Sequence, residues 1–213
     1  MLAKDIMTKA VITIASDTYV LDAERIMEQN RIGRLPIVDN GKLVGIVTKN
    51  DVLKASPAST TPFNQRQLFY LMSKLTVKEI MKTNVLTIAP DTPIEKSVAI
   101  AQQKKVGSLP VVEEGRVVGI LTTNDVFYKI LNPLLGVGEK GKRIIIYGAG
   151  KNEEMQRITE FVRKRGLKVT TYWIPPDPTK RDLIVHLDID DATGVIAELR
   201  SEGYKVELRD FAA

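Results

Sequence analysis

The feature that most constrains this 213-residue chain is an internal repeat. The stretch VGIVTKNDV at 44–52 returns as VGILTTNDV at 118–126, so that Asp51 corresponds to Asp125, 74 positions later (125 − 51 = 74). Residues 5–55 align with 79–129 without a gap, and roughly two positions in five are identical. A register kept over this length predicts two copies of one supersecondary unit.

Composition narrows the classes of protein to consider. The chain is 44% hydrophobic and 27% charged, as ordinary globular proteins are. It has no stretch near the roughly 18 apolar residues that a membrane helix needs, and its start lacks the apolar region of a signal peptide, so we expect a cytoplasmic protein without membrane contact. Having no cysteine, it cannot form a disulfide or a Cys-ligated zinc site. The net charge of +5 favours anionic partners, whether nucleotide phosphates or nucleic acid.

Each copy is predicted to fold as strand, helix, strand, strand, helix. The β-branched segments at 11–14 and 85–88 predict short strands. Helices should follow, with N-caps from the Asp-Thr pairs at 17–18 and 91–92. Two strands joined by a hairpin turn, at Asn40-Gly41 in the first copy, then lead into a second helix.

The rest of the chain does not repeat. Its last segment reads as strand, helix, strand, strand, helix, strand, which is the ferredoxin-like βαββαβ order, so the fold class is α/β (α+β). A helix at 64–75 is predicted from the spacing of Leu68, Leu71, Met72 and Leu75. The expected domains are a first copy at 1–55, a linker with this helix at 56–76, a second copy at 77–133, a glycine- and lysine-rich linker at 134–142 and a final domain at 143–213.

The repeated Thr-x-x-Asp motif, Thr48 with Asp51 and Thr122 with Asp125, has two interpretations. The first is structural: the hydroxyl and the acid form a capping box at a helix start. The second is functional, because a helix start and a threonine hydroxyl suit phosphate, while a carboxylate can accept both hydroxyls of a ribose. The two interpretations can coexist, since one nucleoside phosphate would satisfy both side chains.

Several marks occur in the same order in both copies. They are the openings DIM and EIM, the strands LPIVD and LPVVE, and the endings GIVTKND and GILTTND. With these marks, residues 4–131 resemble a tandem of CBS domains, known as a Bateman module. The resemblance implies a disk with two clefts that take adenosine ligands, namely AMP, ADP, ATP or S-adenosylmethionine.

In that family the Thr-x-x-Asp pair contacts ribose and phosphate, and the adenine lies against the first strand and the residue before Leu-Pro. The resemblance therefore implies two nucleotide-binding sites, one with Thr48, Asp51, Arg34, Ile12 and Ile14, the other with Thr122, Asp125, Ser108, Leu86 and Ile88. Arg34 could hold a phosphate bidentately, which Ser108 cannot. We expect the cleft with Arg34 to favour the more highly phosphorylated ligand; the alternative is that Arg34 is a plain surface charge.

The final domain resembles an ACT or ACT-like domain through its element order and the stretch SEGYKVE. Many ACT domains bind amino acids at the loop after the first strand, but here that loop reads YGAGKNEEM and departs from the usual turn. The same loop lacks the third glycine of a Rossmann fingerprint and the Ser or Thr of a Walker A motif, so we expect a plain strand-to-helix turn. The whole chain is similar to the acetoin-utilisation B (AcuB-like) family of regulatory proteins.

No residues predict catalysis or a metal site. His186 is the only histidine, and its alternating context predicts a strand residue. We therefore expect a non-enzymatic adenine-nucleotide sensor, at least a homodimer, that regulates an unidentified protein. The alternative is a protein-interaction scaffold with vestigial clefts. Nucleic-acid binding is a third possibility, which lacks a helix-turn-helix or a basic stripe to support it.

Overall fold

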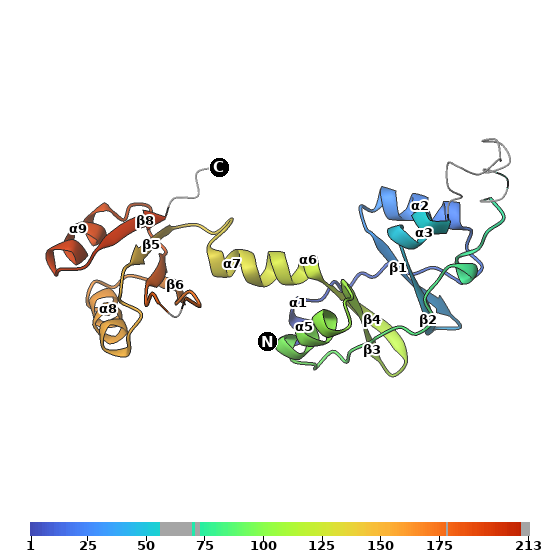
Figure 1. Cartoon of the computed structure of the whole chain (residues 1–213), viewed down its shortest axis with the longest axis horizontal. Coiled ribbons are helices and arrows are strands. Elements are labelled where there is room, and N and C mark those ends of the chain that lie inside the picture. Colours follow the sequence, from blue (N-terminus) through green and yellow to red (C-terminus); the bar gives the residue numbers. More distant parts are fainter. Residues whose placement is uncertain (56–69, 71–72, 178, 210–213) are drawn as a thin grey trace. The chain divides into compact units, whose positions relative to one another are not determined.

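The computed structural model describes residues 1–55, 70, 73–177 and 179–209. The chain divides into two compact units, Met1–Val126 and Phe127–Ala213 (Figure 1). Most of the helix predicted at 64–75 lies outside the described residues, including Leu68, Leu71 and Met72. Of the predicted helix, only positions 70 and 73–75 are described, and Leu75 packs against the core of the first copy.

The first unit contains the first copy of the repeat and the second copy as far as Val126. The first copy provides α2 (Val20–Gln29), β1 (Arg34–Asp39), β2 (Lys42–Thr48) and α3 (Lys49–Ala55), preceded by the short helix α1 (Ala3–Ile6). The second copy provides α5 (Ile94–Gln103), β3 (Ser108–Glu113), β4 (Arg116–Thr122) and α6 (Thr123–Val126), preceded by the 3₁₀ helix η1 (Val77–Glu79).

Both predicted hairpins are confirmed. Strands β1 and β2 pair antiparallel, as do β3 and β4. Asn40 and Gly41 have φ angles of 51° and 77°, which is the left-handed region that a tight two-residue turn requires. Glu114 and Gly115 repeat this turn with φ angles of 49° and 80°. The turns therefore fix the same register in both copies.

The strands predicted at 11–14 and 85–88 are reduced to single bridges, Ile14 with Ile37 and Ile88 with Val111. Proline explains the difference. Ile14 donates to the carbonyl of Pro36 at 3.2 Å, and the next rung of a parallel ladder would need an N–H at Pro36, which proline lacks. The second copy has the same geometry, because Ile88 donates to the carbonyl of Pro110 at 3.1 Å.

The predicted N-caps are wrong. The capping positions are Tyr19 for α2 and Pro93 for α5, and neither side chain makes a capping hydrogen bond. Backbone carbonyls take their place. Val20 donates to Leu75 at 2.8 Å, and Ile94 donates to Met1 at 3.1 Å.

These carbonyls belong to the opening of the other copy, because the two copies exchange their openings (residues 1–8 and 75–82). Thr8 forms a two-way backbone bridge with Ile120 of β4, with both hydrogen bonds at 3.0 Å. Lys82 forms the equivalent bridge with Ile46 of β2, at 2.9 and 3.0 Å. In Figure 1, α1 accordingly lies with the second copy.

Exchange also shapes the core of each copy. Val77, from the opening of the second copy, is fully buried in the first-copy cluster with Val20, Met27 and Leu35. Burying a side chain of this size contributes about 1.5–3 kcal/mol. The core of the first copy is therefore incomplete without a segment from the second.

The second unit starts with the π-helix η2 (Phe127–Leu131) and α7 (Asn132–Leu135). Its remaining elements are β5 (Lys142–Ile146), α8 (Asn152–Lys164), β6 (Val169–Trp173), β7 (Leu183–Leu187), α9 (Thr193–Ser201) and β8 (Val206–Arg209). The βαββαβ order is thus confirmed, and the antiparallel sheet has the order β6-β7-β5-β8. The apolar side of the sheet packs with Ile158, Phe161 and Leu199 of the two helices.

Two buried polar residues lie on the opposite side of the sheet, Arg143 on β5 and His186 on β7. Arg143 Nη1 donates to the carbonyl of Leu134 at 2.9 Å, and His186 Nε2 lies 2.9 Å from the carbonyl oxygen of Lys140. The glycine- and lysine-rich segment at 134–141 is therefore attached to the sheet of its own unit. Burial, and then the charge of Arg209, lower the pKa of Arg143.

Candidate functional site

The Thr-x-x-Asp motif of the first copy lies where β2 ends and α3 begins. Thr48 donates to Asp51 Oδ2 through its hydroxyl at 2.5 Å and through its backbone N–H at 3.0 Å. The backbone N–H of Asp51 donates in return to Thr48 Oγ1 at 3.3 Å. This is a capping box, so the structural interpretation of the motif is confirmed.

The second copy repeats this arrangement between β4 and α6. Thr122 donates to Asp125 Oδ2 through its hydroxyl at 2.7 Å and its backbone N–H at 2.8 Å, and Asp125 donates back to Thr122 Oγ1 at 3.2 Å. The motif thus has one geometry in both copies. Its ligand-binding role stays a prediction.

The exchanged openings add one more side chain to each motif. Lys82 Nζ lies 3.4 Å from Asp51 Oδ1, and the hydroxyl of Thr8 donates to Asp125 Oδ1 at 3.0 Å. Sequence reasoning missed both residues. They occupy equivalent positions of the repeat, but nothing in the sequence told which motif each of them reaches.

The environment of Asp51 favours its ionised form. Burial acts to raise the pKa of Asp51, but the two hydrogen bonds from Thr48 and the charge of Lys82 outweigh it, so the pKa lies below its ordinary value. A carboxylate that stays ionised can accept hydroxyl donors from a ligand.

Arg34 lies beside the first motif in the sheet, because it pairs with Thr48 across β1 and β2. Its guanidinium donates through Nη1 to the carbonyl oxygen of Gly107, in the second copy. Burial lowers the pKa of Arg34. The structure thus gives this residue a defined partner between the copies, and its role toward phosphate stays a prediction.

The predicted adenine-contacting residues lie on segments that cross between the copies. Thr8 bridges to β4 and Ile14 bridges to β1, so Ile12 lies on the crossing and packs against the first-copy core. Leu86 lies on the equivalent crossing from Lys82 to Ile88.

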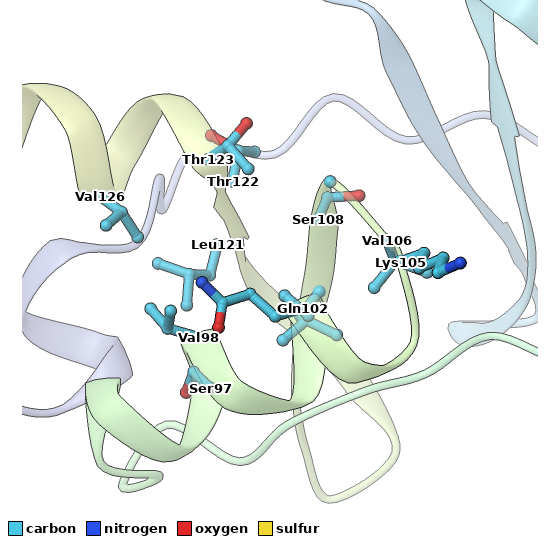
Figure 2. A pocket seen from close by; sticks show the side chains of 13 residues that line it. Ser97, Val98, Gln102, Lys105, Val106, Ser108, Leu121, Thr122, Thr123 and Val126 are labelled. Atoms are coloured by element: carbon cyan, nitrogen blue, oxygen red, sulfur yellow. The ribbon is translucent and has the colours of Figure 1, made fainter.

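A pocket of about 420 Å³ lies in the second copy (Figure 2). It brings together two predicted residues, Ser108 and Thr122, whereas Asp125, Leu86 and Ile88 do not line it. The other lining side chains come mainly from α5 and from the β4–α6 junction: Ser97, Val98, Ala101, Gln102, Lys105, Val106, Leu109, Leu121, Thr123 and Val126. Because most of them are apolar, the pocket suits an apolar group better than a phosphate.

Among the described residues, His, Asp and Glu side chains are nowhere grouped in threes that could hold a metal ion. In the same part, no helix combines the length and the apolar character needed to cross a membrane.

Comparison with known proteins matches the CBS domain family to residues 3–58 and 77–132, which is just over half of the chain. A CBS domain-containing protein of Dictyostelium discoideum is 34% identical over 138 residues, which cover 62% of this chain and 95% of that protein. Inosine-5′-monophosphate dehydrogenase of Korarchaeum cryptofilum is 33% identical over 141 residues, which cover 66% of this chain. The match spans only 26% of that enzyme.

Solved structures give the same result for the repeat. A Vibrio cholerae protein described as an acetoin utilization protein (AcuB) has a TM-score of 0.54 and 34% identity, covering 65% of this chain and 95% of that one. The CBS domain pair of protein MJ0100, in complex with 5′-methylthioadenosine and S-adenosyl-L-methionine, has a TM-score of 0.51 and 34% identity, with 65% and 98% covered. CBSX2 in complex with AMP has a TM-score of 0.51 and 27% identity, with 62% and 96% covered.

Proposed function

The chain belongs to the CBS-domain proteins, and from this premise we propose that it is a regulatory protein that binds adenosine ligands at its two Thr-x-x-Asp motifs. The single observation that carries the proposal is the matching geometry of Thr48 with Asp51 and of Thr122 with Asp125. In each motif the same three hydrogen bonds hold a hydroxyl and a carboxylate in place. These are the two groups that we expect one nucleoside ligand to contact.

The relatives narrow the class of ligand. One CBS pair at 34% identity is solved with 5′-methylthioadenosine and S-adenosyl-L-methionine, and another at 27% identity with AMP. What these ligands share is adenosine. We therefore propose AMP, ADP, ATP or S-adenosylmethionine as the ligand of this chain. Ile12, Ile14, Leu86, Ile88 and Ser108 would lie near the adenine, and Arg34, beside the first motif, would hold a phosphate.

We propose a role in regulation rather than in catalysis. The second unit, with its βαββαβ order, would act as an ACT-like domain that passes ligand binding on through a homodimer to a regulated protein. Binding can do this only if the ligand prefers one of two states of the protein.

One observation favours a scaffold as a second candidate. The threonine and aspartate of each motif satisfy each other, so the capping role alone explains their presence. A scaffold would keep its helix caps and bind a partner protein without nucleotide.

Calorimetric titration with AMP, ADP, ATP and S-adenosylmethionine tests the proposal, after absorbance has shown that no nucleotide was co-purified. We expect binding by at least one of them, and its loss from the first site in Asp51→Ala and from the second in Asp125→Ala. Folded, nucleotide-free protein that binds none of the four would reject the sensor and favour the scaffold.

A further inference from the structure

The exchanged opening of the second copy carries a cation to the motif of the first. Lys82 is fixed by its backbone bridge to Ile46, and the preceding residue, Met81, packs over Gly45. A Cβ atom at Gly45 would lie 2.5 Å from Met81 Sδ and 3.3 Å from the carbonyl oxygen of Lys82. This close approach places the Lys82 side chain at Asp51.

The opening of the first copy is fixed in the same way at the second motif. Thr8 bridges to Ile120, and Met7 packs over Gly119. The side chain presented to Asp125 from this position is a short hydroxyl instead of an ammonium group. At equivalent backbone positions, one motif thus receives a lysine and the other a threonine.

The Lys82–Asp51 contact is loose enough for the ammonium to serve a ligand. Its 3.4 Å separation exceeds an ordinary hydrogen bond, and the side chain of Lys82 is 65% exposed, against 11% for Asp51. The ammonium end of the pair is exposed to solvent, which screens the attraction and lowers the cost of turning the ammonium toward another anion. The Lys ammonium has three donors and suits phosphate oxygens.

Resting on the proposed function, we propose that Lys82 makes the site at Thr48 and Asp51 selective for adenosine ligands that carry a phosphate. Asp51 would accept the ribose hydroxyls and release Lys82, whose ammonium would then pair with the phosphate. The preferred ligand of this site is therefore an adenosine phosphate rather than an adenosine with an uncharged 5′ substituent.

The test compares AMP with 5′-methylthioadenosine, which has the same adenosine but no phosphate. Both are titrated calorimetrically into Lys82→Met and into the unchanged chain, and again in an Asp125→Asn background that leaves only the first site. We expect Lys82→Met to weaken AMP binding at the first site by roughly fivefold or more and to change 5′-methylthioadenosine binding by less than about twofold.

Two further variants make the result specific. Lys78→Met removes an exposed lysine of the same opening, near Asp39 at the far end of β1, and should leave AMP binding unchanged. Thr8→Lys, in an Asp51→Asn background, should strengthen AMP binding at the second site.

The outcomes separate this inference from the proposed function. Unchanged AMP affinity in Lys82→Met, or an equal loss of affinity for both ligands, would overturn the role of Lys82 while leaving adenosine binding intact. If the folded, unchanged chain binds neither of these ligands, nor ADP, ATP or S-adenosylmethionine, the proposed function itself fails and the inference falls with it.

Discussion

Asp51 shows how one side chain can serve the fold and a ligand at once. Its Oδ2 atom accepts both hydrogen bonds from Thr48, while its Oδ1 atom faces Lys82. The fold therefore uses one oxygen of the carboxylate, and the other faces a cation that can move. In the proposed site, Asp51 would exchange this cation for a ribose without losing the helix cap.

Replacing Asp51 by asparagine keeps the shape of the side chain and removes its charge. Because the pKa of Asp51 is lower in the folded protein, its ionised form stabilises the fold above the ordinary pKa of 3.8, and this contribution is lost as the pH falls below that value. We expect Asp51→Asn to lower the free energy of unfolding by about 1 kcal/mol at neutral pH, and the difference from wild type to shrink below pH 3.8. Urea unfolding across the acid range measures both.

Asp22→Asn is the matched control for this prediction. Asp22 lies on the surface of α2 and pairs with Arg25 at 2.9 Å, with both side chains largely exposed. Its replacement should change stability by less than about 0.5 kcal/mol. A pH profile of Asp51→Asn that runs parallel to wild type would contradict the stabilising role of the ionised carboxylate.

The sequence predicted individual elements well where the signal was local. The Asn40-Gly41 turn, the helix starts after Thr48 and Thr122, and the βαββαβ order all depend on neighbouring residues, and all are confirmed. The errors arose where a distant segment decides. The 11–14 strand ends at a single bridge because its partner contains Pro36, and carbonyls from the other opening replace the predicted caps.

The segment between α7 and β5 was predicted as a linker, and its glycines show why it is more than that. Gly136 and Gly138 both have left-handed φ angles, 75° and 77°. A Cβ atom at Gly136 would lie 2.5 Å from His186 Nδ1, whereas one at Gly138 would meet nothing within 4 Å. A substitution at Gly136 therefore tests packing against the sheet in addition to backbone strain, whereas a substitution at Gly138 tests backbone strain alone.

We expect Gly138→Ala to cost about 1 kcal/mol of unfolding free energy and Gly136→Ala to cost roughly 1–3 kcal/mol more. Trp173, the single tryptophan, lies on β6 of the same unit, so its fluorescence follows the unfolding of that unit in urea. Equal costs for the two variants would show that the segment does not pack on His186.

At the scale of the whole molecule, the sequence identified two copies and a different tail, but it could not predict how the copies complete each other. A 74-residue repeat relates Thr8 to Lys82 and says nothing about which hairpin each one joins. The structure supplies that relation through the backbone bridges to Ile120 and Ile46. Each Thr-x-x-Asp motif is therefore contacted by a side chain from the other copy, which no comparison of the copies position by position could reveal.

The single tryptophan also tests communication between the two units. A ligand at 100 times its Kd stabilises the state it binds by about 2.7 kcal/mol. If the second unit responds to binding in the first, as the proposed function requires, saturating AMP should raise the melting temperature reported by Trp173 fluorescence. The rise should vanish in the Asp51→Asn, Asp125→Asn double variant. If AMP leaves the melting temperature reported by Trp173 unchanged, while circular dichroism shows that the first unit is stabilised, the two units act independently.

The exchanged openings also bear on how such a chain could arise. A polypeptide with one copy would leave Gly45 and the Ile46 backbone uncovered, and its own opening would have no hairpin to join. Two identical molecules would solve the problem by swapping openings, and gene duplication with fusion would turn that swap into the intramolecular arrangement seen here. After such a fusion the two openings would be free to diverge, and two motifs that symmetry had kept identical could acquire a lysine on one side and a threonine on the other.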